Sequence, residues 1–288
     1  MNIVPCMTQT NVFPTAPGPI GVFDSGYGGL TILRQIRRTM PQYDYVYLGD
    51  NARAPYGTRS FDVVYEFTRQ AVRFLFGQGC HLVILACNTA SAKALRSIQQ
   101  NDLPELDPQR RVLGVIRPTV EAVGDISKSR HVGIMATPGT IRSTTYELEI
   151  AKLHPDIKVT GEACPMWVPL VENDEYDSPG ADYFVSKRID NLFRRDPDID
   201  SVILGCTHYP LLMGKIRRYM PQGVCIIEQG SYVAQSLQDY LGRHTEMAQR
   251  ITSNGTVRFL TTEQAEAFQQ KATAFMGEPL TAERVSLG

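Results

Sequence analysis

The sequence predicts an α/β protein made of two similar units, each a mostly parallel sheet flanked by helices. Strand-like and helix-like runs alternate along the chain with short connections, which is the pattern of such sheets. Two segments, 82–89 and 201–208, resemble each other: each is a short apolar run that breaks at a small residue, a cysteine and polar side chains. The 288 residues suffice for two domains, and the two cysteines lie 119 residues apart, about one domain's length of chain.

The first series of elements begins at residue 20. Apolar β-branched runs predict buried strands, and apolar residues at helical spacing predict the helices between them. In chain order we expect a strand over 20–23, a helix carrying Leu30, Leu33, Ile36 and Met40, a strand over 43–48, a helix over 60–76, the strand that leads to Cys87, a helix near 90–100 and a strand over 112–116.

The second series begins at residue 132. It comprises a strand over 132–136, a helix over 139–153, a strand near 157–163, a helix near 181–195, the strand that leads to Cys206 and a helix near 211–220. A strand over 224–227, a helix over 231–241, a strand over 257–261 and a last helix over 263–276 follow. The internal similarity is one pair of units, so a solenoid is excluded.

Composition excludes several classes of partner. A formal net charge of −1 and a pI near 6.5 give no electrostatic footprint for nucleic acid or a membrane surface. No stretch is long and apolar enough to cross a bilayer, and residues 1–19 lack the basic start and apolar run of a signal peptide. We expect residues 1–19 to be a mobile extension. Six cysteines without C-x-x-C pairs or zinc-like spacing indicate free thiols, a reducing compartment and a cytoplasmic protein.

Cys87 and Cys206 are the strongest candidates for chemistry. A free cysteine most often packs as a small hydrophobe, and we keep that interpretation for the cysteines at 6, 80, 164 and 225. Polar residues follow the other two thiols, at 88–89 and 207–208, where a core would seldom tolerate them. At the carboxyl ends of parallel strands both thiols could face one substrate, as proton exchange at a single carbon requires. Helix N-termini should lower their pKa and give a useful thiolate at neutral pH.

Two loops that follow strands carry further candidates. Residues 24–29 are rich in glycine, which permits close backbone approach to a ligand, but they lack the G-x-G-x-x-G of dinucleotide sites. Asp24 could orient a thiol proton or bind an amino group, and Ser25 could cap the next helix or bind substrate. The loop 49–57 could be only a turn, or Tyr56 and Gly57 could present a hydroxyl and an N–H to a carboxylate.

Three more positions offer polar side chains near these motifs. His208 lies two residues after Cys206 and could cap a helix, or assist Cys206 or a substrate amino group. Thr137 and Thr140 could cap the helix that follows them or add hydroxyls to the site. On the residues alone these alternatives remain open.

Together the motifs resemble those of glutamate racemases, cofactor-independent enzymes that supply D-glutamate for peptidoglycan. The resemblance covers roughly residues 20–275 and departs from the family's common pattern at Tyr27 and Thr119. It is carried, in order, by Asp24-Ser25-Gly26, Gly28-Gly29-Leu30, Pro55-Tyr56-Gly57, Ala86-Cys87-Asn88-Thr89-Ala90-Ser91 and Gly205-Cys206-Thr207-His208-Tyr209-Pro210-Leu211-Leu212, with support at 136–140 and 168–172. Each motif alone is weak, but the full set in this order is specific.

The resemblance implies which residues form the site. Cys87 and Cys206 would be the two catalytic acid/bases. The contacts to glutamate would be Asp24, Ser25, Tyr56, Gly57, Asn88, Thr89, Thr207 and His208. A second tier would comprise Thr137, Thr140 and Glu172.

The resemblance also implies two α/β domains that face each other across a cleft holding the active site. The first would be discontinuous, residues 20–117 with 226–288, and the second would be residues 118–225. The sequence shows no recognisable stripe of residues that would mark a subunit interface, so the question of a homodimer remains open.

The activity implied is that of an isomerase, a two-base transfer of the Cα proton between the enantiomers of glutamate, with no metal and no cofactor. A pyridoxal phosphate site would need a Schiff-base lysine in a phosphate-binding setting, and Lys93 reads as a surface helix residue. Three rivals remain: a related racemase that acts on aspartate, a non-catalytic module that keeps the fold, and a thiol hydrolase. The hydrolase needs one nucleophile and leaves the second cysteine without a role.

Overall fold

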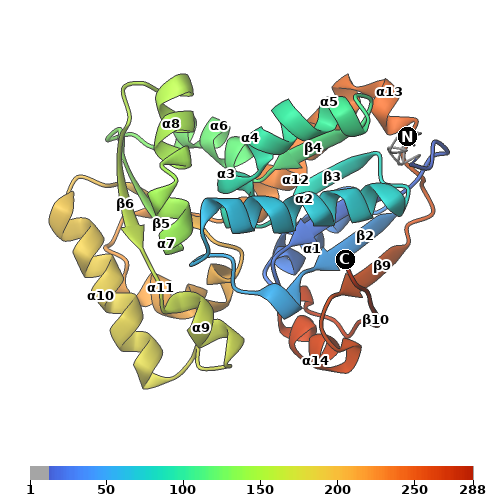
Figure 1. The fold of residues 1–288 in the computed structure, drawn as a ribbon. Helices are drawn as coiled ribbons and strands as arrows, with labels where there is room; N and C mark the ends of the chain where they lie inside the picture. The colour runs from blue at the N-terminus through green and yellow to red at the C-terminus, as the bar shows by residue number, and fades with distance from the viewer. Residues whose placement is uncertain (1–12, 288) are drawn as a thin grey trace, which may run out of the picture.

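The computed structural model describes residues 13–287 and folds them into two parallel sheets, each covered by helices (Figure 1). This confirms the predicted α/β fold with two sheets. Every strand pair among the described residues is parallel, and crossovers between neighbours run through helices, as parallel pairing requires.

The first sheet has six strands in the order β10-β9-β2-β1-β3-β4. Their bounds are β1 Ile20–Asp24, β2 Tyr45–Gly49, β3 Leu82–Leu85, β4 Arg111–Gly114, β9 Val257–Thr261 and β10 Ala282–Arg284. Every residue of β1, β2 and β3 is buried, because helices cover both faces of the sheet. The register sets Ile20 beside both Tyr45 and Leu82, so the three central strands end at nearly the same level.

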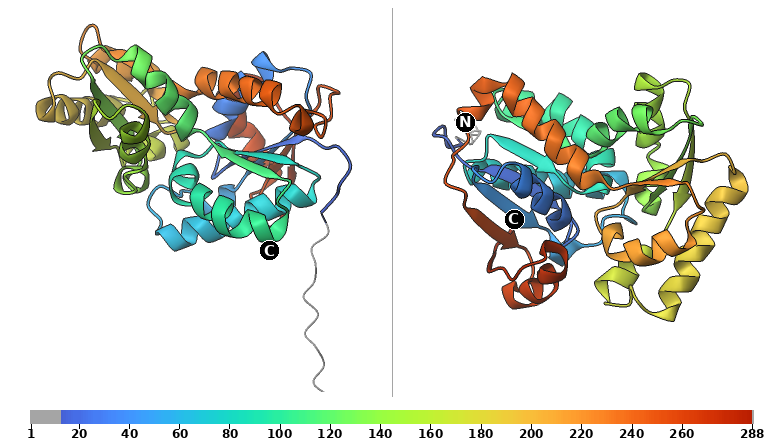
Figure 2. Two further views of the ribbon diagram at one scale, coloured as in Figure 1. Left: turned by 90° about the horizontal axis from the view of Figure 1, so that it is seen from above. Right: turned by 180° about the vertical axis from the view of Figure 1, so that it is seen from behind.

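Helices on opposite faces cover this sheet. On one face α1 (Gly29–Thr39) lies beside α12 (Gln229–Arg243), and α2 (Phe61–Gly77) lies on the other (Figure 2). The shorter elements are η1 Asn51–Arg53, α3 Asn88–Lys93, α4 Leu95–Ser97, η2 Ile98–Asp102, α5 Leu103–Leu106 and α13 Thr245–Ala248, and the last helix is α14 Ala265–Met276. The chain thus returns to the first sheet near its end, through α12, β9, α14 and β10.

The second sheet has four strands in the order β6-β5-β7-β8. Their bounds are β5 His131–Ala136, β6 Lys158–Ala163, β7 Ser201–Gly205 and β8 Cys225–Ile227. The helices of this unit are α6 Ile116–Ile126, α7 Pro138–Arg142, α8 Thr145–Leu153, α9 Trp167–Glu172, α10 Pro179–Arg195, η3 Tyr209–Leu212 and α11 Met213–Tyr219. Among these, α6 packs on α8 and α10 packs on α11.

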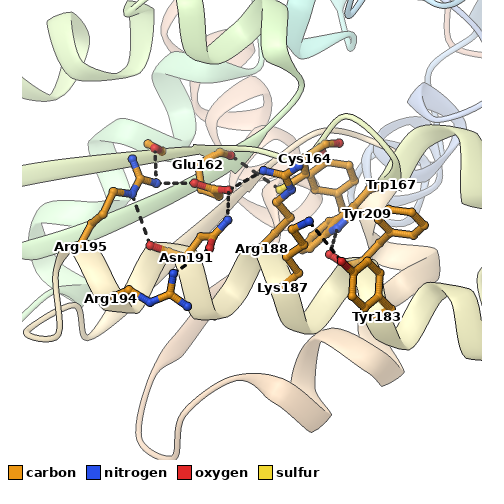
Figure 3. A network of polar contacts seen from close by, with 12 residues as sticks. Glu162, Cys164, Trp167, Tyr183, Lys187, Arg188, Asn191, Arg194, Arg195 and Tyr209 are labelled. Atoms are coloured by element: carbon orange, nitrogen blue, oxygen red, sulfur yellow. Dashed lines mark hydrogen bonds and ion pairs between the residues drawn. The ribbon is translucent and has the colours of Figure 1, made fainter.

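A polar network fastens α10 to the edge strand β6. The Glu162 carboxylate lies between Arg188, Asn191 and Arg195, which are three or four residues apart on one face of the helix (Figure 3). The Arg188 guanidinium donates to it over 3.1 Å. Close to this network (Figure 3), Trp167 packs edge-on against Tyr209 at 4.7 Å between ring centroids. These contacts hold α10 against β6 and α9 against η3.

Several predicted elements differ in detail from those observed. The helix expected over 139–153 is two helices, because Thr144 adopts a left-handed conformation (φ 52°) between α7 and α8. The helix expected near 90–100 is broken into α3, α4 and the π-helical η2. The strand expected over 112–116 ends at Gly114, and Ile116 already begins α6. The eleven-residue helix α6 was not predicted. The short elements η1, α5, α9, α13 and β10 were not predicted either.

The predicted domain boundaries stay a prediction, with one refinement. Since β8 pairs with β7, residues 226 and 227 lie in the second sheet and not in the first unit.

Of the expected mobile extension, residues 1–12 lie outside the described residues. The rest packs on the first unit: Phe13 stacks edge-on against Phe76 at 5.6 Å, and the Ala16 carbonyl lies 2.8 Å from His81 Nε2. Within residues 13–287, no helix has both the length and the apolar character that a membrane span needs.

Candidate active site

The site forms where the carboxyl ends of strands from both sheets meet. Asp24 ends β1 and Cys87 follows β3 in the first sheet, while Cys206 follows β7 in the second. Ligands bind at this end of parallel sheets because strand ends and helix starts leave polar groups there. The Asp24 carboxylate and the Thr207 hydroxyl touch at 3.4 Å across the two units. The predicted convergence of the two thiol-bearing segments is therefore present in the structure.

Cys87 occupies the position that caps α3. Its Sγ accepts from the Ala90 N–H at 3.4 Å and lies 3.4 Å from the Ser25 hydroxyl. The residue is 6% exposed. Burial raises the pKa of Cys87 to about 12, and the charge of Asp24 adds to the rise. The expected lowering of this pKa by a helix N-terminus was therefore wrong for Cys87, because loss of solvation outweighs the N–H groups of a six-residue helix.

Cys206 has a different neighbour. Its Sγ lies 3.9 Å from His208 Nδ1, and His208 Nε2 lies 3.1 Å from the Glu172 carboxylate. Burial acts to lower the pKa of His208, but the contacts with Cys206 and Glu172 outweigh it and raise that pKa to about 10. The imidazole thus carries a proton at neutral pH and places a cation beside the Cys206 sulfur. His208 makes no side-chain cap for η3, so the capping alternative does not hold.

Asp24 links the two halves of the site. It is fully buried, accepts the Gly26 N–H at 2.9 Å and receives the Thr207 hydroxyl. Burial raises the pKa of this carboxyl, and His208 opposes the rise. Ser25 does not cap α1, and its hydroxyl lies against Cys87 instead. A buried carboxylate in this position offers a partner for a substrate ammonium group.

Three threonine hydroxyls form a triangle between the units. Thr89 Oγ1 lies 3.0 Å from Thr137 Oγ1 and 3.3 Å from Thr140 Oγ1, which are 3.1 Å apart. Thr137 also caps α7, so both of its proposed roles are compatible. Each hydroxyl has one hydrogen and rotates freely, so the triangle can turn donors toward a bound carboxylate.

The loop 49–57 contributes in a way that the sequence did not indicate. The Tyr56 hydroxyl donates to Asp50, whose carboxylate also binds the Arg53 side chain at 2.7 Å. The hydroxyl is therefore already engaged and does not present itself to a substrate carboxylate. Tyr56 nevertheless belongs to the same buried cluster as Cys87. Gly57 contacts the second unit, where its carbonyl accepts a hydrogen bond of 2.8 Å from the Gly139 N–H.

Asn88 and its partners include two residues that sequence reasoning missed. Asn88 donates to Gln229 at 2.5 Å and accepts from the Tyr146 hydroxyl at 2.7 Å. Gln229 and Tyr146 belong to no motif and lie far from Asn88 in sequence, so no local pattern identifies them. Lys93 was also misjudged: it is 7% exposed, and its ammonium group donates to the Arg59 carbonyl at 2.7 Å.

One cluster of possible metal ligands occurs among the described residues, and it lies away from the thiols. It comprises His131, Asp196 and Asp198, beside the start of β5. Asp196 already binds the His131 ring at 2.8 Å and the Lys158 ammonium group at 3.2 Å. These partners satisfy the carboxylate without an ion. The expectation of a site without metal or cofactor stays an expectation.

Comparisons with known proteins agree with the fold and motifs. The family model of Asp/Glu/Hydantoin racemase matches residues 28–237. A glutamate racemase from Paracoccus denitrificans is 42% identical over 271 residues, 91% of this chain and 97% of its own. The crystal structure of glutamate racemase isoform RacE1 from Bacillus anthracis has a TM-score of 0.85 at 34% identity and covers 94% and 98% of the two chains. That of glutamate racemase from Francisella tularensis, in complex with D-glutamate, has a TM-score of 0.83 at 32% identity, with the same coverage.

Proposed function

Because this chain belongs to the glutamate racemase family, within the Asp/Glu/hydantoin racemases, we propose that it interconverts L- and D-glutamate by a two-base proton transfer at Cα. Cys87 and Cys206 are the two acid/bases. The observation that supports this most directly is that both buried thiols border one group of polar side chains. In this group the Ser25 hydroxyl contacts the Cys87 sulfur, and the Asp24 carboxylate contacts Thr207, the residue after Cys206.

The two thiols differ in their neighbours. Cys87, whose raised pKa keeps it a thiol at neutral pH, can donate a proton, and Cys206, which lies beside the protonated His208, is the base of this proposal. In this resting state Cys206 takes the Cα proton that faces it, and Cys87 donates its own proton to the opposite face of the carbanion. One C–H bond breaks and another forms, and the negative charge passes from Cys206 to Cys87. The other enantiomer requires the reverse assignment.

Other residues bind the substrate and stabilise the charge that develops. Asp24 faces the ammonium group, and the threonine triangle of Thr89, Thr137 and Thr140 receives a carboxylate. Gly57, Asn88 and Thr207 complete the contacts, and Tyr56 supplies a wall beside Cys87. Positioned proton transfer accounts for about 10²–10⁴-fold of the rate, so fixed dipoles and exclusion of water must supply the rest.

The setting follows from the same proposal. D-glutamate made in the cytoplasm would serve peptidoglycan synthesis, and no nucleic acid or membrane takes part. A homodimer is compatible with this function, but the function does not require one. No observation on this chain favours aspartate as the substrate.

The proposal is tested with purified protein, L-glutamate, D₂O, a thiol reductant and no added cofactor. Optical rotation and deuterium at Cα are followed for the wild type and for Cys87→Ser and Cys206→Ser. Racemisation with deuterium uptake in the wild type, and loss of racemisation in both variants, supports the two-thiol mechanism. No rotation change and no deuterium uptake with glutamate would overturn the substrate, and the same assay with aspartate would then test the nearest rival.

A further inference from the structure

Gln229, the first residue of α12, is the centre of a buried polar network that joins the two units. Its Nε2 donates to the Tyr146 hydroxyl at 2.8 Å, to Thr119 Oγ1 at 3.1 Å and to the Val115 carbonyl at 3.3 Å. Its Oε1 accepts from Asn88 at 2.5 Å. The side chain is 4% exposed, so solvent cannot replace these partners.

The network fixes the orientation of the Asn88 amide. Asn88 immediately follows Cys87, and it uses one N–H on Gln229 and its oxygen on the Tyr146 hydroxyl. An amide with both ends bonded cannot flip, because a flip would set the Asn88 oxygen against the Gln229 Oε1 oxygen and the Asn88 N–H against the Tyr146 O–H. One N–H of the amide then remains for a ligand at the strand end.

We propose that Gln229 is a positioning residue that acts through Asn88: it holds the amide beside Cys87 in the one orientation that presents its second N–H to the substrate. The substrate part of this inference rests on the proposed racemase activity, whereas the positioning of the amide does not. Neither Gln229 nor its partners Tyr146 and Thr119 belongs to the motifs that identify the family.

The network reaches both thiol-bearing segments. Tyr146 lies on α8 and Thr119 on α6, in the second unit, and the Tyr146 ring lies against the backbone of Gly205, where an added Cβ would come within 3.2 Å. The residue after Gly205 is Cys206. Gln229 therefore joins the segment that carries Cys87 to Tyr146, whose ring lies against the residue before Cys206.

The support from Thr119 is specific enough to be tested by itself. Thr119 is fully buried, and its hydroxyl donates back to the Val115 carbonyl at 3.0 Å while it accepts from Gln229. Thr119→Val keeps the shape and removes that acceptor, and Thr119→Ser restores it. Thr68 on α2 is a matched control, since it is also fully buried and bonded to a carbonyl four residues back, but has no contact with Gln229.

The kinetic test uses Gln229→Met, which keeps the length of the side chain and removes all of its hydrogen bonds. We expect the KM for glutamate to rise about tenfold, with kcat within about threefold, because an unpaired buried amide loses its fixed orientation. Thr119→Val should raise KM by a smaller factor, and Thr119→Ser and Thr68→Val should leave it unchanged. In an Asn88→Ala background, Gln229→Met should have no further effect on KM, since residues that act through one another are not additive.

A second readout does not depend on the reaction. In protein labelled with ¹⁵N-asparagine, the side-chain resonances of Asn88 are identified by their loss in Asn88→Ala. They should shift in Gln229→Met and Thr119→Val and stay in place in Thr68→Val. Thermal unfolding of each variant shows which of them are folded, and Thr119→Val supplies the answer if Gln229→Met is not.

The outcomes separate the two proposals. If the wild type does not racemise glutamate, the proposed function fails, and the resonances of Asn88 still decide whether Gln229 positions it. If the wild type racemises glutamate but the effects of Gln229→Met and Asn88→Ala on KM multiply, Gln229 does not act through Asn88. Resonances that stay in place in both network variants overturn the inference as well.

Discussion

The Nδ1 atom of His208 lies 3.9 Å from the sulfur of Cys206, while the other ring nitrogen lies 3.1 Å from the carboxylate of Glu172. The ring is thus held between two groups that favour its proton, in a residue only 4% exposed. Cys87 has no cation beside its sulfur among the contacts described for it; a hydroxyl and a backbone N–H touch it instead. The two thiols of this site are therefore not equivalent in the resting protein.

His208→Gln should lower racemisation by about 10²-fold, because Cys206 loses the cationic partner beside its sulfur. The change should also affect stability in a pH-dependent way. A folded pKa raised from 6.5 to about 10 stabilises the protein fully below pH 6.5, and this contribution disappears as the pH rises through 10. Urea unfolding at pH 6, 8 and 10 should show a cost of His208→Gln that shrinks along the series.

A surface histidine provides the control for this prediction. His244 also lies 3.1 Å from a carboxylate, that of Glu246, but both side chains are largely exposed. His244→Gln should change neither the rate nor the pH dependence of stability, since exposed pairs contribute little. An equal cost of His208→Gln at pH 6 and pH 10 would contradict the charged state assigned to His208.

The ring of Tyr27 stacks on two rings of α14, and these contacts join the last helix to the first loop of the site. Tyr27 stacks on Phe268 at 5.4 Å and on Phe275 at 5.8 Å between centroids, and Phe275 meets His208 edge-on at 5.4 Å. Phe275→Leu should lower the free energy of unfolding by about 1–2 kcal/mol, through lost ring contacts and a small void. It should also lower kcat, because the His208 ring loses one wall.

Thermal unfolding and initial rates check the effect of Phe275→Leu. Phe61→Leu is the comparison, because Phe61 also stacks on a ring, that of Tyr65, but is 49% exposed. It should leave both measurements unchanged. A stable and fully active Phe275→Leu variant would show that α14 does not support His208.

The thiols and their flanking polar residues could be predicted because the signal is local. Apolar runs that break at Cys87 and Cys206 mark strand ends, and parallel strands bring such ends together. The environment of each thiol could not be predicted in the same way. The raised pKa of Cys87 comes from burial and from Asp24, which is brought to it only by the pairing of β1 with β3.

The residues that sequence reasoning missed are those whose partners are distant in the chain. Gln229 meets Asn88 across 141 residues, and Tyr146 meets it across 58. No periodicity encodes such contacts. The split between α7 and α8 was missed for a different reason, since Thr144 is left-handed without being a glycine or an asparagine, and nothing in its neighbourhood marks the turn.

Asp200 should make stability fall in acid. Burial acts to raise the pKa of its carboxyl, but the N–H groups of Ser129 and Lys128 and two serine hydroxyls outweigh it and lower that pKa to about 2. A depressed pKa stabilises the fold above the unfolded value near 4, and this contribution is lost as the pH falls toward 2. Asp200→Asn should cost about 1–2 kcal/mol at pH 7 and progressively less below pH 4.

Urea unfolding at pH 7, 5 and 3 measures the cost of Asp200→Asn. Asp190→Asn, at an exposed position of α10, should cost nothing at any of these values. The prediction fails if the cost of Asp200→Asn at pH 3 equals that at pH 7.

Gly28 should be the least replaceable glycine of the site, because α1 begins directly against the Cys206 segment. A Cβ at Gly28 would lie 2.2 Å from the Thr207 hydroxyl oxygen and 2.6 Å from His208 Nδ1. Gly28→Ala must therefore displace one or both side chains, and a displacement of about 1 Å costs about 10²-fold in rate.

Gly242 provides the control, because nothing lies within 4 Å of its Cβ position inside α12. Gly242→Ala should stabilise the helix by about 0.5–1 kcal/mol and leave the rate unchanged. Initial rates and urea unfolding of the two variants distinguish crowding at the site from a general effect of removing a glycine. If Gly28→Ala keeps the wild-type rate, Thr207 and His208 do not need the positions that they occupy here.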